Sequence, residues 1–310
     1  MRLLLIGCTG FIGKELVPSL IKEGHEIIII SRKNMKNLQL NIPFNKFKFL
    51  KIDLSKKQNW SNEILIDHLK EVDGIINLIG EPIADKKWTV AQKKEIENSR
   101  IQSTKFLMES LKKSRINPKV IINGSAIGFY GTSLTEEFNE NSISGSDFLA
   151  KLCEKWEKVA AEKPLFSRLV ILRIGIVLEA EGGALSKMLP VFKIGLGGPI
   201  GDGNQWMSWI HRSDLCGLII NALVDKKFSG VFNAVAPEPV LMKDFTKILG
   251  KCLNRPNLLP VPSRILKVLL GEGAKLVLEG QKVKSIKLKE NKYKFKYPLL
   301  EKAIYAATKK

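Results

Sequence analysis

The sequence predicts a doubly wound α/β fold, in which helices cover both faces of one parallel sheet, with a small, mostly helical C-terminal lobe. Short apolar runs alternate with segments of helical apolar spacing from residue 3 to residue 234, and this alternation is typical of parallel sheets. The first run, residues 3–6, is apolar throughout, as expected for a strand buried on both faces. From residue 237 onward the segments read as helices.

Residues 1–24 contain a strand, a glycine turn and a helix. The strand is residues 3–6, and the helix is indicated by apolar residues at helical spacing, namely Leu16, Val17, Leu20 and Ile21. Gly24 lies where a helix C-cap is expected. Pro18 falls inside this helix, and we expect it to kink the helix locally without ending it.

The turn carries glycines at a spacing of three residues. Glycines let a backbone approach phosphate groups, and the start of the following helix presents free N–H groups and partial positive charge. Between a strand and a helix, this spacing predicts a Rossmann-type dinucleotide site. The pyrophosphate is expected at Gly7, Thr9, Gly10, Phe11, Ile12 and Gly13. The alternative is a tight turn without a ligand.

The second strand, residues 25–31, indicates which dinucleotide is bound. Sites that prefer NAD usually place an acidic residue about 20 residues after the glycines, where it binds the ribose 2′-hydroxyl. Here Ser31 and Arg32 stand at the end of the strand. A hydroxyl and a guanidinium suit a 2′-phosphate, so the sequence favours NADP over NAD. The alternative is that Arg32 is an ordinary surface residue.

Four further strands are expected at residues 47–52, 72–79, 120–123 and 169–174, with helices at 64–70, 92–112 and 148–161. Residues near the strand ends, and one on helix 92–112, complete the predicted cofactor contacts: Asp53, Leu54, Asn77, Gly80, Arg100, Ser125 and Gly175. Residues 81–89 form a loop over this edge, and Glu81 is a candidate substrate contact.

A glycine-rich segment, residues 195–203, precedes the string QWMSWIH at residues 205–211. Trp206 and Trp209 are candidate walls of a substrate pocket or simply core residues. His211 is a candidate catalytic residue or a hydrogen-bonded structural one. We expect Asp214 to cap the helix of residues 214–224. We further predict that Trp206, Trp209 or His211 faces the cleft opposite Ser125 and Tyr130, with the C-terminal lobe closing over it.

The organisation suggests a nucleotide-binding domain over residues 1–235, within which residues 178–212 contribute to the substrate cleft. A strand at 230–234 ends this domain. Helix-like segments at 244–252, 263–270 and 274–278 then form a small domain over residues 236–310.

The formal net charge is +19, from 50 Lys and Arg against 31 Asp and Glu. Residues 281–310 hold many of the lysines, but no basic motif of a known nucleic-acid-binding type accompanies them. We therefore predict no specific nucleic-acid partner, only weak, salt-dependent binding. A phosphate-rich cofactor or anionic substrate would also be attracted to this charge.

Other sequence features indicate the cellular location of the protein and the state of its cysteines. No apolar run approaches the roughly 18 residues that a membrane helix requires, and the N-terminus enters the first strand without a signal-like segment. We expect a cytoplasmic protein with no membrane partner. Cys8, Cys153, Cys216 and Cys252 are scattered, which argues against a metal site or disulfides. The oligomeric state is not predicted.

Residues 7–13, GCTGFIG, resemble the opening of the extended short-chain dehydrogenase/reductase superfamily, which includes nucleotide-sugar epimerases and dehydratases. Further strings resemble an atypical epimerase-like branch with its own C-terminal domain, sometimes labelled a cell-division inhibitor. These strings lie at residues 77–84, 187–190, 195–199, 205–211, 230–237 and 280–283. The resemblance spans nearly the whole chain and implies a Rossmann fold and NADP binding, without naming a substrate.

The chain departs from the superfamily at the catalytic residues. That superfamily usually carries a serine and a Y-x-x-x-K motif, with an acid often four residues after the lysine. Ser125 matches the serine, but aligning Glu157 with the acid places Leu149 and Cys153 in the tyrosine and lysine positions. Because leucine cannot transfer a proton, Tyr130 is the nearest alternative acid, although packing alone would also account for it.

Two functions remain open. The first is an NADP-dependent oxidoreductase or epimerase-like enzyme in which Ser125 orients a carbonyl or hydroxyl and Tyr130, His211 or water moves the proton. The second is a non-catalytic NADP-binding sensor or interaction protein. The absent tyrosine–lysine pair favours the second, whereas the glycine- and tryptophan-rich segment favours a small-molecule pocket and hence the enzyme.

Overall fold

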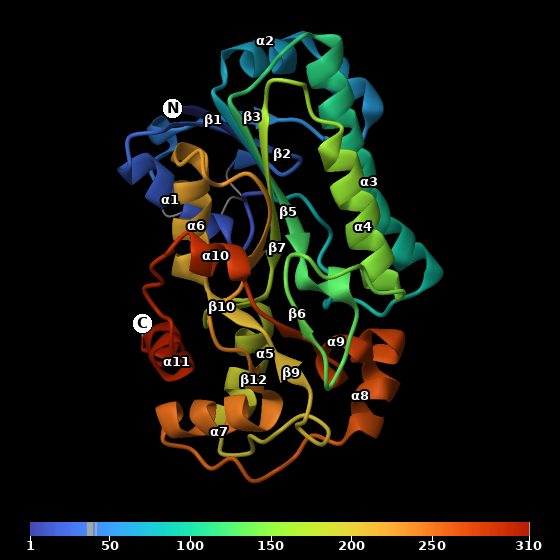
Figure 1. Ribbon diagram of the computed structural model, residues 1–310, viewed down its shortest axis with the longest axis vertical. Helices are drawn as coiled ribbons and strands as arrows, with labels where there is room; N and C mark the ends of the chain where they lie inside the picture. Colours follow the sequence, from blue (N-terminus) through green and yellow to red (C-terminus); the bar gives the residue numbers. More distant parts are fainter. Residues whose placement is uncertain (36–39, 41, 310) are drawn as a thin grey trace.

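The computed structural model describes residues 1–35, 40 and 42–309. Its centre is a seven-stranded sheet in the order β11-β7-β5-β4-β1-β2-β3, in which every neighbouring pair is parallel (Figure 1). The strands are β1 (Arg2–Ile6), β2 (Glu26–Ser31), β3 (Lys48–Lys51), β4 (Gly74–Asn77), β5 (Val120–Ala126), β7 (Arg168–Ile174) and β11 (Gly230–Ala234). This arrangement confirms the predicted fold class.

Helices cover both faces of this sheet (Figure 1). Alternate residues of β1 belong to different cores, since Leu3 and Leu5 pack on one face and Leu4 and Ile6 on the other. The first face is covered by α1 (Gly13–Lys22) and α6 (Arg212–Val224). The second is covered by α2 (Glu63–Glu71), α3 (Val90–Lys113) and α4 (Phe148–Ala161). Burial on both sides explains why the strands are apolar at successive positions.

The chain changes direction in the sheet between β1 and β4. From β1 it runs outward to β2 and β3, then returns to β4 on the other side of β1. The carboxyl ends of β1 and β4 therefore separate two sets of crossovers, which is where open α/β sheets bind ligands. Helix α1 is continuous through Pro18.

A buried polar network holds β4 and β5 to α3 and α4. Asn77, at the end of β4, donates to the side chain of Asn123 at 2.7 Å and to Thr104 Oγ1 at 3.0 Å. Trp156 Nε1 donates to the same threonine oxygen at 2.9 Å. Hydrogen-bonded partners satisfy polar groups that would otherwise be costly to bury, so this network fixes the strand ends.

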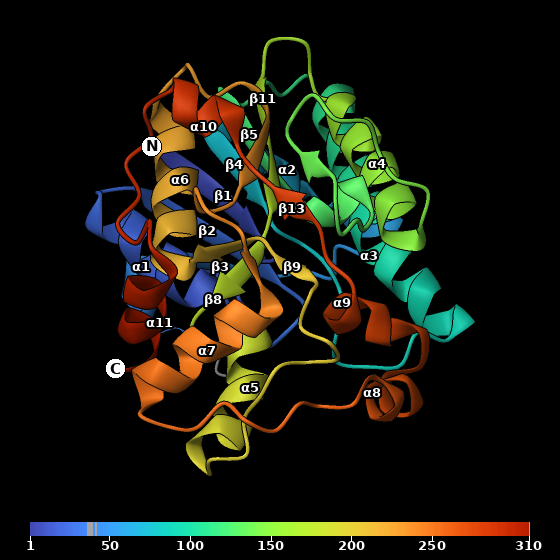
Figure 2. The same cartoon turned by 60° about the horizontal axis from the view of Figure 1, so that its bottom comes forward.

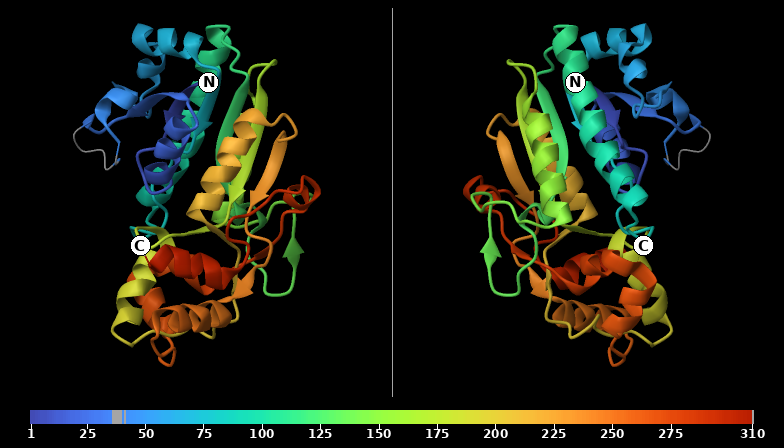
Figure 3. Two further views of the ribbon diagram at one scale, coloured as in Figure 1. Left: turned by 90° about the vertical axis from the view of Figure 1, so that its left-hand side faces the viewer. Right: turned by 90° about the vertical axis from the view of Figure 1, so that its right-hand side faces the viewer.

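The lobe lies beyond the carboxyl ends of the strands (Figures 1 and 3). Its helices are α5 (Gly183–Lys193), α7 (Met242–Leu253), α8 (Ser263–Leu270), α9 (Lys275–Leu278), α10 (Ile286–Glu290) and α11 (Leu300–Thr308), of which α10 packs back on β11. Short strands accompany them, namely β6 (Glu137–Phe138), β8 (Ile176–Leu178), β9 (Trp206–Met207), β10 (Trp209–His211), β12 (Val240–Leu241) and β13 (Lys282–Val283). The 3₁₀ segments of the chain are 44–46, 57–61, 127–130 and 271–274.

Several lobe elements were not expected from the sequence. The core of the lobe combines residues from β8, α5 and β10 with residues from α7 and α11. Helix α5 begins at Gly183, directly after the N-cap Gly182, and contains Pro190, features that obscure a helical pattern. Strands β8 and β10 pair in parallel although they are distant in sequence. The local sequence around each therefore does not predict a strand.

The far end of the lobe also contacts the sheet domain. Leu276 of α9 packs with Trp88, Ile96, Phe148 and Leu149 in one apolar cluster. Figure 1 shows α8 and α9 below the lower ends of α3 and α4, and in the turned view of Figure 2 both still lie below α4. An ion pair between Lys93 and Glu272, at 2.5 Å, joins the same two regions. The lobe is thus attached to the sheet domain on both sides of the strand ends.

We expect Asn77→Ala to lower the free energy of unfolding by about 1–3 kcal/mol, because it leaves the buried Asn123 oxygen without its donor. Urea denaturation would measure this loss. The control is Asn141→Ala at an exposed position, which should change stability by no more than about 0.5 kcal/mol. Equal effects of the two changes would contradict the proposed role of the network.

Candidate functional site

The glycine turn after β1 contains two kinds of glycine. Gly7 has φ +75°, and a Cβ there would lie 2.5 Å from the backbone nitrogen of Ile79; a Cβ on Gly13 would lie 1.7 Å from the carbonyl oxygen of Cys8. The fold itself therefore requires both glycines. At Gly10, by contrast, no described atom beyond its chain neighbours lies within 4 Å of a Cβ position.

The open space at Gly10 lies at the start of α1. Ile12 is the N-cap, and among the described side chains none caps this helix end. An uncapped helix N-terminus attracts anions through its N–H groups and dipole. Packing of the fold does not require a glycine at position 10, yet the space around Gly10 is left open. A dinucleotide pyrophosphate fits this space.

Of the residues predicted to contact the adenosine end of the cofactor, one has a side chain that is buried in the core. Arg32 is exposed beside Glu81, with 3.8 Å between guanidinium and carboxylate. Hydrogen bonds from Ser55 lower the pKa of Asp53, and nearby Arg32 contributes to the same shift. Ser31 Oγ accepts from the backbone of Lys33. The Leu54 side chain is instead buried in the core between the sheet and α2 and α3, so its predicted contact with adenine is not available to that side chain.

At the end of β4, the side chains predicted to contact the cofactor instead contact other groups of the protein. The side chain of Asn77 is 1% exposed within the polar network, so it fixes the strand end instead of reaching a cofactor. Arg100 donates to the carbonyls of Glu81 and Ile96, and a Cβ on Gly80 would lie 2.7 Å from its guanidinium. Burial lowers the pKa of Arg100. Arg100 thus holds the turn that leads to Glu81.

Gly175 also has a packing explanation. A Cβ at this position would lie 2.7 Å from the carbonyl oxygen of Ser208. Ile176 donates its backbone N–H to the same oxygen at 2.9 Å. The glycine therefore lets the end of β7 pass close to the turn between β9 and β10, and its predicted contact with the cofactor is not needed to explain it.

A buried ion pair lies at the ends of β5 and β7. Arg173, in β7, donates from Nε and Nη2 to the two carboxylate oxygens of Glu157 in α4, at 2.9 and 2.8 Å. Ser125, in β5, donates to Oε1 of the same carboxylate at 2.6 Å. Burial lowers the pKa of Arg173, but hydrogen bonds to Glu157 and its charge outweigh burial and raise the pKa overall.

Tyr130 extends this cluster toward the C-terminal segment. Its hydroxyl accepts from Arg173 Nη1 at 2.9 Å and donates to Asn233 Oδ1 at 2.7 Å. Asn233 in turn donates to the carbonyl of Lys284. Burial raises the pKa of Tyr130. The structure therefore brings Ser125 and Tyr130 into one network, with Arg173 between them.

The two aligned catalytic positions hold residues with packing roles. Leu149 lies in the apolar cluster with Trp88 and Leu276. The Cys153 thiol is buried, and burial raises its pKa to about 11. A thiol with this pKa is protonated near neutral pH and is a poor nucleophile.

The predicted set of Trp206, Trp209 and His211 is not brought to one side of the cleft. Trp209 is 1% exposed in the lobe core and donates Nε1 to the carbonyl of Glu238. His211 is 1% exposed and caps α6 by accepting from the Ser213 N–H. Its ring is tilted by 44° against the ring of Tyr297, with 4.1 Å between the centroids. The prediction that Trp206, Trp209 or His211 faces the cleft therefore depends on Trp206.

Trp206 occupies a different position from the other two residues. Its Nε1 donates to the carbonyl of Leu134, in the loop that follows Tyr130. Its ring lies 5.0 Å from the Nζ of Lys282. It is the member of the predicted set that lies against the β5 side of the site.

Asp214 does not cap α6, because His211 holds that position. Its carboxylate accepts from the backbone N–H groups of Lys296 and Tyr297, at 2.5 and 3.0 Å. Burial raises the pKa of Asp214 despite these hydrogen bonds. It ties the C-terminal segment to α6.

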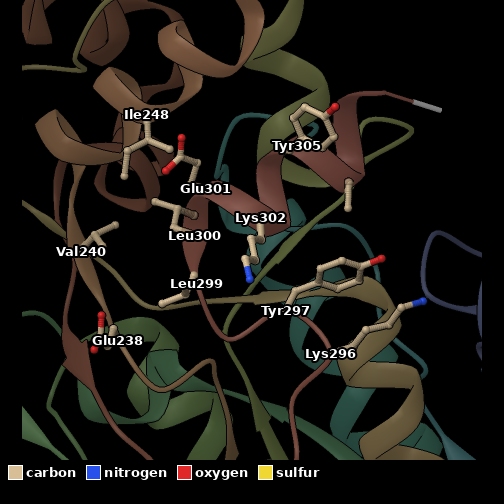
Figure 4. A pocket seen from close by; sticks show the side chains of 11 residues that line it. Glu238, Val240, Ile248, Lys296, Tyr297, Leu299, Leu300, Glu301, Lys302 and Tyr305 are labelled. Atoms are coloured by element: carbon tan, nitrogen blue, oxygen red, sulfur yellow. The ribbon is translucent and has the colours of Figure 1, made fainter.

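A pocket of about 730 Å³ lies elsewhere, between α7, α11 and the segment before α11. Figure 4 shows Tyr297, Leu300, Lys302 and Ile248 around it. None of the described glycine-turn residues lines it. Its apolar lining lacks the strand ends that the fold provides for nucleotide binding, so the candidate site stays at the sheet.

Sequence reasoning missed the partners of two buried arginines. Arg173 was visible only as the end of a strand, and Arg212 only as the residue after His211. Arg173 lies near the end of β7 and Arg212 directly follows β10, and a charged side chain in such a position is rarely buried without a partner. That signal identifies the arginines but not the distant carboxylates that pair with them.

The comparisons with known proteins agree with this geometry. A model of the NAD dependent epimerase/dehydratase family matches residues 3–234, and a domain of unknown function, DUF1731, matches residues 261–307. The chain belongs to this epimerase/dehydratase family, within the short-chain dehydrogenase/reductase superfamily. The family resemblance inferred from the sequence is confirmed.

Within the family, the chain is similar over its whole length to epimerase family protein SDR39U1. It is 41% identical to the chloroplastic homologue of Arabidopsis thaliana, covering 99% of this chain and 86% of the relative. It is 36% identical to YfhF of Bacillus subtilis, covering 98% and 97%. The crystal structure of human SDR39U1 with NADPH has a TM-score of 0.85 at 33% identity, covering 99% of both chains.

None of the helices described is long and apolar enough to cross a membrane. Within the residues that the structure describes, no group of three or more His, Cys, Asp or Glu side chains could hold a metal ion.

We expect Cys153→Ala to leave nucleotide affinity unchanged, because the thiol is protonated and buried near the network without joining the ion pair. Fluorescence titration with NADPH would measure this. In the native protein, iodoacetamide should label the partly exposed Cys252 before the buried Cys153. Loss of function in a folded Cys153→Ala variant would instead give the thiol a chemical role.

Proposed function

We propose that the chain is an NADP-dependent oxidoreductase or epimerase-like enzyme acting on a small molecule, with Ser125 and Glu157 in place of the usual tyrosine and lysine. The observation that carries the proposal is the 2.6 Å hydrogen bond from Ser125 to a carboxylate held by Arg173. This cluster lies at the carboxyl ends of the central strands, where the fold places ligands.

The choice of NADP rests on three observations. The glycine turn has space for a pyrophosphate at Gly10. Arg32 is exposed at the end of β2, where a 2′-phosphate would lie. A relative of equal length was crystallised with NADPH. When bound, the nicotinamide would supply the donor or acceptor of a hydride.

The direction of the Ser125 hydrogen bond indicates which substrate group it meets. A carboxylate only accepts hydrogen bonds, so the single hydroxyl hydrogen of Ser125 is directed to Glu157. Ser125 then presents lone pairs, which accept from a substrate hydroxyl. In oxidation of an alcohol, the substrate proton passes to Ser125 Oγ as the serine proton passes to Glu157 Oε1; reduction reverses both transfers.

The remaining polar groups position this pair. Arg173 offsets the charge of Glu157 in a site that excludes water, and its guanidinium lies 3.4 Å from the centroid of the Phe129 ring. Tyr130 is committed to Arg173 and Asn233. We therefore assign Tyr130 to the support of Arg173 and not to proton transfer.

A specific observation also favours the second candidate, a non-catalytic NADP-binding sensor. Ser125 is 4% exposed, and Leu149, in the aligned tyrosine position, packs in an apolar cluster with Leu276 of the lobe. Under this alternative, the nucleotide would be bound and the substrate position would stay closed. Turnover separates the two functions.

We do not propose nucleic acid as a partner, since many C-terminal lysines have contacts within the protein. Lys282 and Lys284 pair with Glu137 at 3.0 and 3.1 Å. Lys287 lies 5.3 Å from the centroid of the Phe232 ring. These contacts support a structural role for part of the lysine-rich segment.

The nucleotide preference is tested by titrating NADPH and NADH. NADPH should bind more tightly, and Arg32→Ala should weaken NADPH by about tenfold or more, because a charge-assisted contact to the 2′-phosphate is lost. NADH affinity should not change. Lys33→Ala is the control, since it removes a neighbouring exposed charge. Equal affinities for both nucleotides would overturn the preference.

The chemistry is tested with NADPH or NADP and a panel of ketones, alcohols and nucleotide sugars. Ser125→Ala and Glu157→Gln should each lower turnover by about a hundredfold or more while NADPH affinity is kept, because the proton path is interrupted. Glu154→Gln, in the same helix and paired with Lys158, is the control. Tight NADPH binding without turnover of any compound would favour the sensor.

A further inference from the structure

Arg212 is a buried arginine outside the Ser125 cluster. It is the first residue of α6, and its side chain is 5% exposed. Its guanidinium contacts three carboxylates, from Glu15 at 2.8 Å, Glu179 at 3.2 Å and Glu181 at 3.2 Å. It also donates to the carbonyl of Phe11 at 3.4 Å.

These partners come from two separate parts of the site. Phe11 lies in the glycine turn, and Glu15 lies in the first turn of α1. Glu179 and Glu181 lie in the turn between β8 and α5, at the start of the lobe. The Phe11 ring closes the same junction, because a Cβ on Gly182 would lie 2.4 Å from it. Arg212 thus joins the glycine turn to the lobe.

The charges at this junction bear directly on anion binding. Glu15 lies in the helix turn whose N-terminus fits the pyrophosphate, and Glu179 is fully buried nearby. Carboxylates close to a phosphate site repel the ligand unless a cation offsets them. The planar guanidinium suits this position because it bonds several oxygens at once, which an ammonium group cannot reproduce.

We propose that Arg212 is a positioning residue for the dinucleotide: it holds the glycine turn in its binding conformation and offsets the carboxylates beside the pyrophosphate. Through Glu179 and Glu181 it also fixes the start of the lobe relative to the bound nucleotide. This inference rests on the proposed function, because it assumes that NADPH binds at the glycine turn.

The test compares Arg212 with Arg168, at the other end of α6. Arg168 donates to the carbonyls of Ala222, Leu223 and Phe228, so it supports the same helix away from the glycine turn. We expect Arg212→Met to weaken NADPH binding by about tenfold or more, and Arg168→Met to lower the melting temperature without changing NADPH affinity. Arg212→Lys keeps the charge and should give an intermediate affinity.

Fluorescence titration with NADPH and thermal unfolding would be measured for each variant. If Arg212→Met does not fold, Arg212→Lys and Glu15→Gln together decide the question: weaker binding in the lysine variant, partly restored by the added Glu15→Gln, supports the proposal. Unchanged NADPH affinity in folded Arg212 variants would overturn it. Failure of the wild-type protein to bind NADPH would instead overturn the proposed function.

Discussion

The ion pair between Arg173 and Glu157 is the interaction on which the centre of the molecule depends. Burying two charges is costly unless their geometry and other hydrogen bonds compensate. Here the pair has two parallel hydrogen bonds, and Ser125 and Tyr130 bond to its outer atoms. Loss of either charged partner would leave the other unpaired in the core.

Glu157 of this pair is the residue aligned with the acid that follows the superfamily's lysine. Its carboxylate is occupied here by Arg173 and Ser125. At the aligned tyrosine and lysine positions, Leu149 lies in an apolar cluster and Cys153 is buried.

The sheet was predictable because its residues are buried on both faces and leave a continuous apolar signal. The glycine turn was predictable for a related reason, since both Gly7 and Gly13 lie against backbone atoms and tolerate no side chain. Asn77 shows the limit of this reasoning. A polar residue at a strand end has the same sequence signature whether it contacts a ligand or a neighbouring strand, and here it contacts Asn123.

The lobe was harder to predict because its partners are distant in the chain. Trp209 and His211 lie in a glycine-rich stretch that suggested an open pocket, yet β10 pairs with β8 and carries both into the interior. Helix α11 completes that core from the other end of the chain. The local sequence pattern does not indicate which side of such a strand faces solvent.

The return of the C-terminal segment to the sheet domain has a consequence for synthesis of the protein. A nascent chain that has emerged to residue 234 contains all seven strands of the main sheet. It still lacks β13, which pairs with β6, and the backbone groups that bond to Asp214 and Ser208. Domains assembled from such distant contacts fold slowly. Until residues 282–297 have left the ribosome, β6, Ser208 and Asp214 lack these partners, so the contacts that complete the fold form last.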